Sequence, residues 1–186
     1  IPKHMDCITA KLVEMGVEVE EREDTLLVRR SGPLQKANVK TMPYPGFPTD
    51  CQAIFMAALL QSRGTTVFVE NIFQSRYRHV PELIRMGADI RTEGRVAVVC
   101  GVERLHGAEV VATDLRGGAA LVLAGLAARG NTVITHPAHI DRGYAGFTEI
   151  LAGLGAQIRR ESAPGNGTAK KTSVKKQICL AIGAKR

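Results

Sequence analysis

Arg116 stands where a cation is unfavourable, in the first turn of the helix predicted after Asp114. The backbone N–H groups of a helix start carry partial positive charge, so a cation there costs a few tenths to about 1 kcal/mol. Gly117 and Gly118 follow, and glycine leaves the backbone amides open to close approach. A cation, bare amides and a helix start together predict an anion site. The local sequence leaves a second interpretation equally open, in which Arg116 only pairs with Asp114 or another acid.

Two more arginines occupy matching strand-to-helix turns, Arg76 in residues 74–77 and Arg142 in residues 141–144. A single arginine in such a loop is usually a solvated side chain. Two at equivalent places, with Arg116 at a helix start, favour convergence on a phosphate or carboxylate. The planar guanidinium group suits both anions because it donates two parallel hydrogen bonds.

Asp50 is the candidate general base. It follows the proline-rich loop 43–49, which fixes the approach to a predicted helix. A carboxylate at a helix start also balances the helix dipole, and for an isolated aspartate this structural role is the commoner one. Beside a cluster of arginines, a carboxylate can accept a proton from a substrate hydroxyl held within reach. Both roles stay open at this point.

Other chemistry has little support in the sequence. The five histidines show no metal-ligand spacing, and the four cysteines show no paired spacing, so we expect no metal site and buried free thiols. Neither a phosphate-binding P-loop nor a dinucleotide-binding motif is present.

A duplicated pattern positions the candidate residues. Residues 37–95 and 104–161 share one order of strand, helix, strand, helix, strand, strand, and Arg76 and Arg142 stand at matching places in the two copies. A partial copy, about residues 1–30, precedes them, which makes about two and a half repeats. A duplicated unit places equivalent loops at the same end of the assembly, where their side chains can meet.

Hydrophobic periodicity outlines the elements of each copy. Thr49-Asp50 and Thr113-Asp114 are matched between the copies and are each expected to open an apolar helix, and Thr49 and Gln52 have capping-box spacing. The second of these helices is apolar nearly all round, which is typical of a helix buried on every side. We therefore expect an α/β fold with helices inside and sheets outside. The predicted helices cover approximately residues 5–15, 50–62, 81–86, 115–128 and 144–154, and predicted strands include residues 26–28, 67–69, 96–99 and 132–134.

Composition predicts one globular domain at residues 1–161, and a basic, flexible tail at residues 162–186. The tail holds six cations and no acid, so all but one of the net positive charges of +7 belong to it, and nucleic-acid binding by the domain is not indicated. No segment reaches the roughly 20 apolar residues of a membrane span, and no signal peptide is visible. We expect a soluble, cytoplasmic protein, and a fragment, because the sequence enters a repeat halfway and lacks an initiating Met.

At these residues the chain resembles a known family, the UDP-N-acetylglucosamine enolpyruvyl transferases, over about residues 3–161. The turn at residues 141–144 and the loop at residues 43–50 separate this family from the enolpyruvyl transferases that act on shikimate phosphate. The segments that carry the resemblance are Pro43-Tyr44-Pro45-Gly46-Phe47-Pro48-Thr49-Asp50, Arg76 with residues 79–83, Ala112-Thr113-Asp114-Leu115-Arg116, residues 121–126, and Ile140-Asp141-Arg142-Gly143-Tyr144.

The resemblance implies a protein of two similar domains, each an inside-out α/β barrel of three repeats. It implies transfer of the enolpyruvyl group of phosphoenolpyruvate to the 3-hydroxyl of UDP-N-acetylglucosamine, with release of phosphate, as the committed step of peptidoglycan synthesis. Asp50 would take the hydroxyl proton and Ile72 would contact the sugar nucleotide through its backbone. Arg116 and Arg142 would hold phosphoenolpyruvate, with Arg76 nearby, and Asp114 would contact substrate. Neither a metal nor an organic cofactor is expected.

The chain departs from the family at several points. Gly117-Gly118-Ala119-Ala120 stands where the family usually has small polar residues, and residues 162–186 do not resemble the short family C-terminus. The cysteine-bearing loop of the family belongs to the other domain, so we expect an N-terminal domain as partner and little turnover by this chain alone. A shikimate-phosphate transferase and a non-catalytic anion-binding fragment remain as alternatives.

Overall fold

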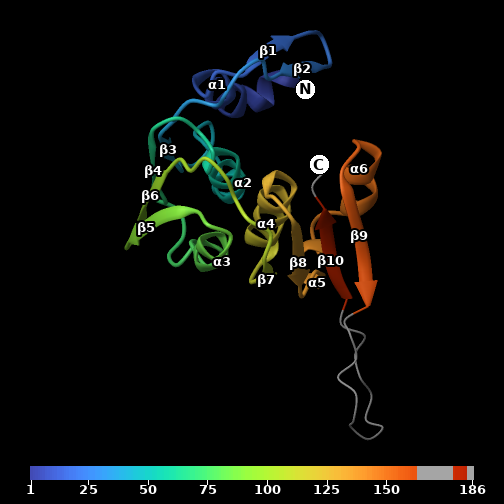
Figure 1. The fold of residues 1–186 in the computed structure, drawn as a ribbon. Coiled ribbons are helices and arrows are strands. Elements are labelled where there is room, and N and C mark those ends of the chain that lie inside the picture. The colour runs from blue at the N-terminus through green and yellow to red at the C-terminus, as the bar shows by residue number, and fades with distance from the viewer. Residues whose placement is uncertain (163–177, 184–186) are drawn as a thin grey trace, which may run out of the picture. The chain divides into compact units, whose positions relative to one another are not determined.

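The computed structural model describes residues 1–162 and 178–183, which form a mixed α/β fold (Figure 1). The fold divides into two compact units. Unit 1 contains residues 1–77 and 88–103, and unit 2 contains residues 78–87 and those from 104 onward. The limits of the units differ from those of the sequence repeats, because the helix at residues 80–85 packs with the unit that follows it.

Unit 1 combines a helix and a two-stranded hairpin with a four-stranded sheet and one long helix. Its elements are η1 (Pro2–Met5), α1 (Asp6–Glu14), β1 (Glu18–Glu21), β2 (Leu26–Arg29), β3 (Val39–Lys40), α2 (Thr49–Leu59), β4 (Thr65–Val69), β5 (Asp89–Glu93) and β6 (Val96–Cys100).

Unit 2 has one four-stranded sheet and four helices in its described part. Its elements are α3 (Val80–Arg85), β7 (Glu109–Val111), α4 (Leu115–Ala127), β8 (Asn131–Thr135), α5 (Ala138–Asp141), α6 (Phe147–Gly153), β9 (Gln157–Ser162) and β10 (Ile178–Gly183).

The two four-stranded sheets have the same topology. Their strand orders are β3-β4-β6-β5 and β7-β8-β10-β9. In each sheet the first two strands are parallel and the other pairings are antiparallel, with Val39 opposite Phe68 in one and Val110 opposite Ile134 in the other. Parallel neighbours need a crossover connection, which α2 and α4 provide. The loops that leave both parallel strands therefore lie at one edge of each sheet.

Hydrogen bonds outside the sheets repeat as well. The Gln35 amide donates to the Met15 carbonyl oxygen at 2.9 Å, and at the matching place of the next copy the His106 amide donates to the Met86 carbonyl oxygen at 2.8 Å. The residue after α1 is thus bonded to the segment before β3 in the same way as the residue after α3 is bonded to the segment before β7.

The tail prediction is wrong for residues 178–183. This uncharged segment forms β10, which pairs with β8 and β9 and takes the place that β6 has in unit 1. The long interval between β9 and β10 hid the correspondence, because only two residues separate β5 from β6. The basic residues of the predicted tail, at 170–176 and 185–186, lie outside the described residues.

The predicted equivalence of Asp50 and Asp114 in the two copies is also wrong. Along the chain, α4 begins as far after α2 as β8 begins after β4, so Asp50 shares its place with Arg116 as second residue of its helix. Asp114 lies outside its helix as the N-cap, with extended backbone at φ −158°. The capping box fails for a related reason, because Pro48 is the N-cap of α2 and no side chain caps it.

Helix α4 is buried on nearly all sides, as its apolar sequence predicts. Eight of its 13 residues are buried, and it contacts α3, α5, β8 and β10. Leu121, Ile134 and Ile140 are fully buried in unit 2, as are Met56, Leu59 and Phe68 in unit 1. No helix in the described ranges has both the length and the apolar character needed to cross a bilayer.

Two glycines allow neighbouring backbone segments to lie in close contact. A Cβ on Gly101 would overlap the Ser62 carbonyl oxygen, and one on Gly107 would overlap the Asn131 carbonyl oxygen. The Gly101 amide donates to the Gly64 carbonyl oxygen at 3.1 Å and the Val102 amide to that of Leu60 at 2.8 Å, which holds the residues after β6 against the segment between α2 and β4. Any side chain at Gly101 must push two backbone segments apart.

We predict that Gly101→Ala lowers the free energy of unfolding by about 1–3 kcal/mol, because overpacking against backbone cannot be relieved by rotating a side chain. Gly153→Ala is the matched control, since Gly153 ends α6 with nothing within 4 Å of the added methyl group. Urea denaturation followed by circular dichroism measures both variants. Equal midpoints for Gly101→Ala and the unsubstituted chain would contradict the predicted contact.

Candidate active site

All six predicted site residues lie in loops or helix starts that follow the parallel strands. Asp50, Ile72 and Arg76 belong to unit 1 and follow β3 or β4. The other three belong to unit 2, where Asp114 and Arg116 follow β7 and Arg142 follows β8. The carboxyl edge of a parallel strand pair is the common place for ligand-binding loops in α/β proteins.

Asp50 and Arg76 form an ion pair in unit 1. The Arg76 Nη2 atom donates to Asp50 Oδ1 at 2.9 Å. The Arg76 guanidinium also lies over the Phe73 ring, 5.1 Å from its centre. The Asp50 side chain remains 54% exposed, so a ligand can approach this carboxylate. Asp50, the candidate base, and one of the predicted arginines therefore lie side by side within unit 1.

Unit 1 also contains a buried carboxylate, Glu70, which is only 1% exposed. Its Oε1 atom accepts hydrogen bonds from the Thr41 hydroxyl at 2.9 Å and from the amides of Ile72 and Phe73 at 2.9 and 3.1 Å. Its Oε2 atom accepts from the Thr49 hydroxyl at 2.9 Å. Four donors approach the capacity of a carboxylate, which is what burial of the group requires.

The turn from Asn71 to Tyr77 is held at both ends. The Asn71 amide donates to the Thr41 hydroxyl at 2.9 Å, and Arg95 Nη1 donates to the Asn71 carbonyl oxygen at 3.0 Å. The Tyr77 hydroxyl reaches the carbonyl oxygens of Phe68 and Arg95 at 3.3 and 3.1 Å. Burial, and then the negative charge of Glu70, raise the pKa of Tyr77, so its hydroxyl stays protonated as a donor.

In unit 2, Asp114 acts on its own helix. Its Oδ1 atom accepts from the Gly117 amide at 2.8 Å, and the Thr113 hydroxyl donates to Oδ2 at 3.3 Å. Gly117 and Gly118 are buried, and a Cβ on Gly118 would lie 2.7 Å from Ile140 Cγ1. The predicted opening of this glycine pair to an anion is therefore wrong. The glycines let α4 pack closely, and the Gly117 amide is capped.

The Arg116 guanidinium lies over the Tyr144 ring, with its central carbon 5.2 Å from the ring centre. Tyr144 packs in turn on Phe147, with ring centres 5.0 Å apart. Stacking on an aromatic face favours a cation by about 0.5–1 kcal/mol at an exposed site, which offsets the unfavourable helix start.

Arg142 follows α5 directly, and its neighbour Asp141 is tied to the sheet. The Arg160 Nη1 atom donates to Asp141 Oδ2 at 2.9 Å, and Arg160 Nη2 donates to Asp141 Oδ1. The hydrogen bond with Asp141 raises the pKa of Arg160. Gly143 lies against Leu115, so closely that a Cβ would come within 2.6 Å of Leu115 Cδ2. These contacts hold the turn of Arg142 against the start of α4, where Arg116 lies.

Sequence reasoning missed the supporting residues Glu70, Tyr77 and Arg160. Glu70 had a signal, because a glutamate directly after a buried strand must find donors when its neighbours pack. Arg160 had none, since its partner Asp141 lies 19 residues away and only the pairing of β9 places the two together. The role of Tyr144 as a stacking platform was likewise not predicted.

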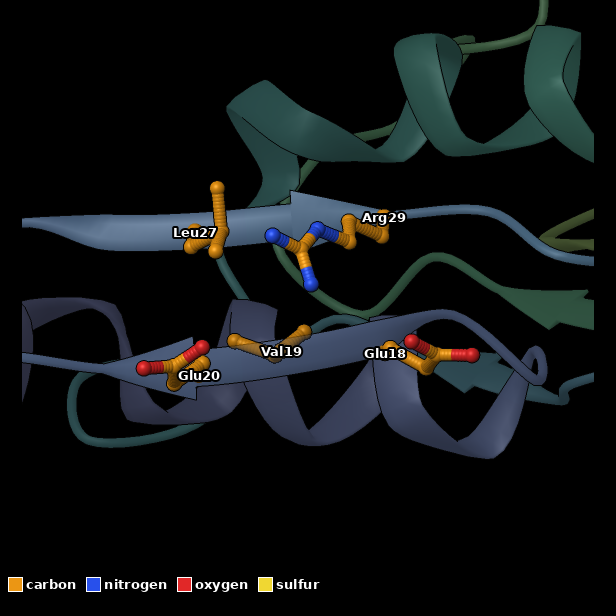
Figure 2. Close-up of a pocket in the computed structure, with 5 residues that line it drawn as sticks. All are labelled: Glu18, Val19, Glu20, Leu27 and Arg29. Carbon is orange, nitrogen blue, oxygen red and sulfur yellow. The ribbon is translucent and has the colours of Figure 1, made fainter.

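A small hollow on the β1–β2 hairpin contains none of the predicted site residues. Figure 2 shows the side chains that line it, which are Glu18, Val19 and Glu20 from β1 and Leu27 and Arg29 from β2. Within the described part of the chain, no three His, Cys, Asp or Glu side chains gather in a way that could hold a metal ion.

Comparisons with known proteins identify the family of the chain. Residues 2–151 match the family model of EPSP synthase (3-phosphoshikimate 1-carboxyvinyltransferase). The UDP-N-acetylglucosamine 1-carboxyvinyltransferase of Desulfofundulus thermocisternus is 54% identical over 180 residues, which cover 97% of this chain and 74% of that relative. UDP-N-acetylglucosamine 1-carboxyvinyltransferase 3 of Caldanaerobacter subterraneus subsp. tengcongensis is 54% identical over 160 residues, which cover 86% of this chain and only 38% of that relative.

Solved structures show the same fold. The enolpyruvyl transferase NikO from Streptomyces tendae is similar with a TM-score of 0.79 and 31% identity, over 86% of this chain and 37% of that one. EPSP synthase from Acinetobacter baumannii has a TM-score of 0.62 at 18% identity, over 96% and 38% of the two chains, which speaks for the fold alone. The chain therefore belongs to the EPSP synthase family of carboxyvinyl transferases, and its similar relatives include those named UDP-N-acetylglucosamine 1-carboxyvinyltransferase.

Proposed function

We propose that the chain is part of an enzyme that transfers the enolpyruvyl group of phosphoenolpyruvate to the 3-hydroxyl of UDP-N-acetylglucosamine. Similarity to relatives named for this transfer carries the proposal, and the Asp50–Arg76 pair supplies a chemical basis for it. The reaction would commit the sugar nucleotide to peptidoglycan synthesis in the cytoplasm.

Length supports a role as part of a larger assembly. The chain spans 38% of one relative and 74% of another, so we propose that an N-terminal domain supplies the remaining contacts, including the cysteine-bearing loop. The described sheets would then belong to an inside-out barrel in which helices such as α4 form the centre. Two full copies and one partial copy of the repeat account for about two and a half of its three units.

Unit 1 would act on the sugar nucleotide. The Asp50 carboxylate is half-exposed and oriented by Arg76, so it can accept a proton from a hydroxyl held beside it. Ile72 lies in the neighbouring turn, and its amide already donates to Glu70. The Ile72 carbonyl oxygen is therefore the backbone group that would contact the sugar, by accepting a hydrogen bond from a sugar hydroxyl.

Unit 2 would act on phosphoenolpyruvate. Arg116 and Arg142 are fork-shaped cations that suit its phosphate and carboxylate groups. Stacking on Tyr144 holds Arg116, and the Asp141–Arg160 pair holds the turn that bears Arg142. Asp114 would support this site mainly by capping α4, since its carboxylate accepts from the Gly117 amide.

The proposed reaction is an addition followed by an elimination. The sugar 3-oxygen bonds to C2 of phosphoenolpyruvate while Asp50 takes the hydroxyl proton, and an acid on the other domain delivers a proton to C3. The resulting tetrahedral ketal then loses phosphate from C2 and a proton from C3, which restores the double bond. Positioning and charge stabilisation by the arginines supply the catalysis, and no step requires a metal.

A second substrate, shikimate phosphate, is kept as an alternative because the matching family model carries the name of that enzyme. Both acceptors present a hydroxyl group to the same carboxylate. A competition assay separates them, since the proposal requires turnover with the sugar nucleotide and little with shikimate 3-phosphate.

We predict that phosphate is released from phosphoenolpyruvate and UDP-N-acetylglucosamine when the chain is mixed with the separately made N-terminal domain of the Caldanaerobacter relative. Asp50→Asn keeps the shape and an acceptor for Arg76 but cannot take the proton, so release falls by about a hundredfold or more. Asp89→Asn, at an exposed place in β5 of the same unit, is the matched control and should keep full activity. No release from a folded wild-type mixture would count against the proposed function.

A second prediction concerns the two cations of unit 2. Arg116→Lys and Arg142→Lys keep the charge but remove the planar fork, so each raises the KM for phosphoenolpyruvate by about tenfold to a hundredfold. The KM for the sugar nucleotide should change much less. Arg129→Lys, an exposed position of unit 2, serves as control in the same steady-state assay. Parallel changes in both KM values would argue against a specific role for these cations.

A further inference from the structure

The buried Glu70 carboxylate joins three segments that carry the candidate site of unit 1. Thr41 follows β3, Thr49 precedes Asp50 at the start of α2, and the Ile72–Phe73 turn follows β4. All three donate hydrogen bonds of 2.9–3.1 Å to this single side chain. A shift of this carboxylate must therefore move the candidate base and the sugar-contacting turn together.

The duplicated sheet shows that the fold does not need this network. Directly after β8, at the place of Glu70, unit 2 has His136. Its first residue of α4, at the place of Thr49, is Leu115. Ala112 takes the place of Thr41, because the amides of both donate to the carbonyl oxygen that ends the parallel partner strand. The same sheet topology thus forms without the carboxylate and without either hydroxyl.

Burial of Glu70 adds a thermodynamic argument. A carboxylate that is 1% exposed is costly unless its oxygens are satisfied, and removing a partner leaves it unsatisfied. Its donors within the described residues are neutral hydroxyl and amide groups, so no ion pair among them explains its place. Glu70 is costly to bury, and unit 2 forms the same sheet without an equivalent carboxylate. Orientation of the bonded loops therefore explains Glu70 better than a need of the fold does.

We propose that Glu70 is a positioning residue, which orients the Asp50 end of α2 through Thr49 and the sugar-contacting turn through the Ile72 and Phe73 amides. The inference rests on the proposed function for its catalytic consequence. It does not make Glu70 a catalytic residue, because its oxygens face protein donors. Its effect is on acceptance of the sugar nucleotide, and unit 2 contacts to phosphoenolpyruvate are left unchanged.

The kinetic test uses the chain mixed with the separately made N-terminal domain. Glu70→Ala should raise the KM for UDP-N-acetylglucosamine by about tenfold and lower kcat, while the KM for phosphoenolpyruvate stays the same. Glu70→Gln should recover most of the loss, because its carbonyl oxygen can accept from the turn while its amide group donates to the Thr49 oxygen. Thr49→Val, which cuts only the arm to α2, should lower kcat with little change in the sugar KM.

A measurement without catalysis tests the same contacts. Hydrogen exchange of the Ile72 and Phe73 amides, followed by NMR in the chain alone, should be faster by about tenfold in Glu70→Ala. Glu93→Gln, an exposed glutamate at the end of β5, is the control for both experiments and should change neither. Exchange at residues of β6 reports whether the variant keeps its sheet.

The outcomes separate the two proposals. A wild-type mixture that releases no phosphate defeats the proposed function, whereas unchanged amide exchange in Glu70→Ala defeats the positioning role whatever the mixture does. An active mixture in which Glu70→Ala leaves the KM for UDP-N-acetylglucosamine unchanged would also overturn it, since loss of the bonds to the Ile72–Phe73 turn must weaken sugar-nucleotide binding. Selective loss of sugar-nucleotide binding, recovered by Gln, supports it.

Discussion

Parallel pairing of two strands is the constraint on which each unit depends. Strands β3 and β4, and likewise β7 and β8, run side by side in the same direction, so a helix must cross over between them. The crossover brings the loops after both strands to one edge of the sheet. The side chains of those loops are not needed for strand pairing, so their residue types can vary to bind ligands or to catalyse a reaction. All six candidate residues come from these loops or from the helix starts that follow them.

The two units use this shared geometry for opposite charges. Asp50 and Arg116 are each the second residue of the crossover helix, and Arg76 and Arg142 each follow the second parallel strand. An acid at a helix start agrees with the dipole, whereas a cation opposes it. The acid in unit 1 is oriented by an arginine, and the cation in unit 2 rests on the Tyr144 ring. Duplication of one scaffold thus places an acid and a cation at equivalent positions, for which we propose the roles of proton acceptor and anion-binding group.

Much of the fold could be predicted because it depends on local pattern. The helices at residues 49–59 and 115–127 lie close to their predicted limits, since a Thr-Asp pair opens each long apolar run. The match of Asp50 with Asp114 between the two copies was wrong because an N-cap residue and a residue of the first helical turn look alike in sequence. Only the structure shows that Asp114 has extended backbone. Strand β10 was not predicted because a long interval of sequence separates it from its partner β9.

The sequence by itself determined which residue types stand at the helix starts and turns, and therefore that a carboxylate and several guanidinium groups were available for chemistry. Only the tertiary structure decided how they are held. Glu70, Tyr77 and Arg160 act through partners that include residues far away along the chain, such as Thr41, Arg95 and Asp141. Such contacts form when strands pair and loops meet, so no local pattern can specify them, whereas periodicity and helix starts arise from neighbouring residues and can be predicted.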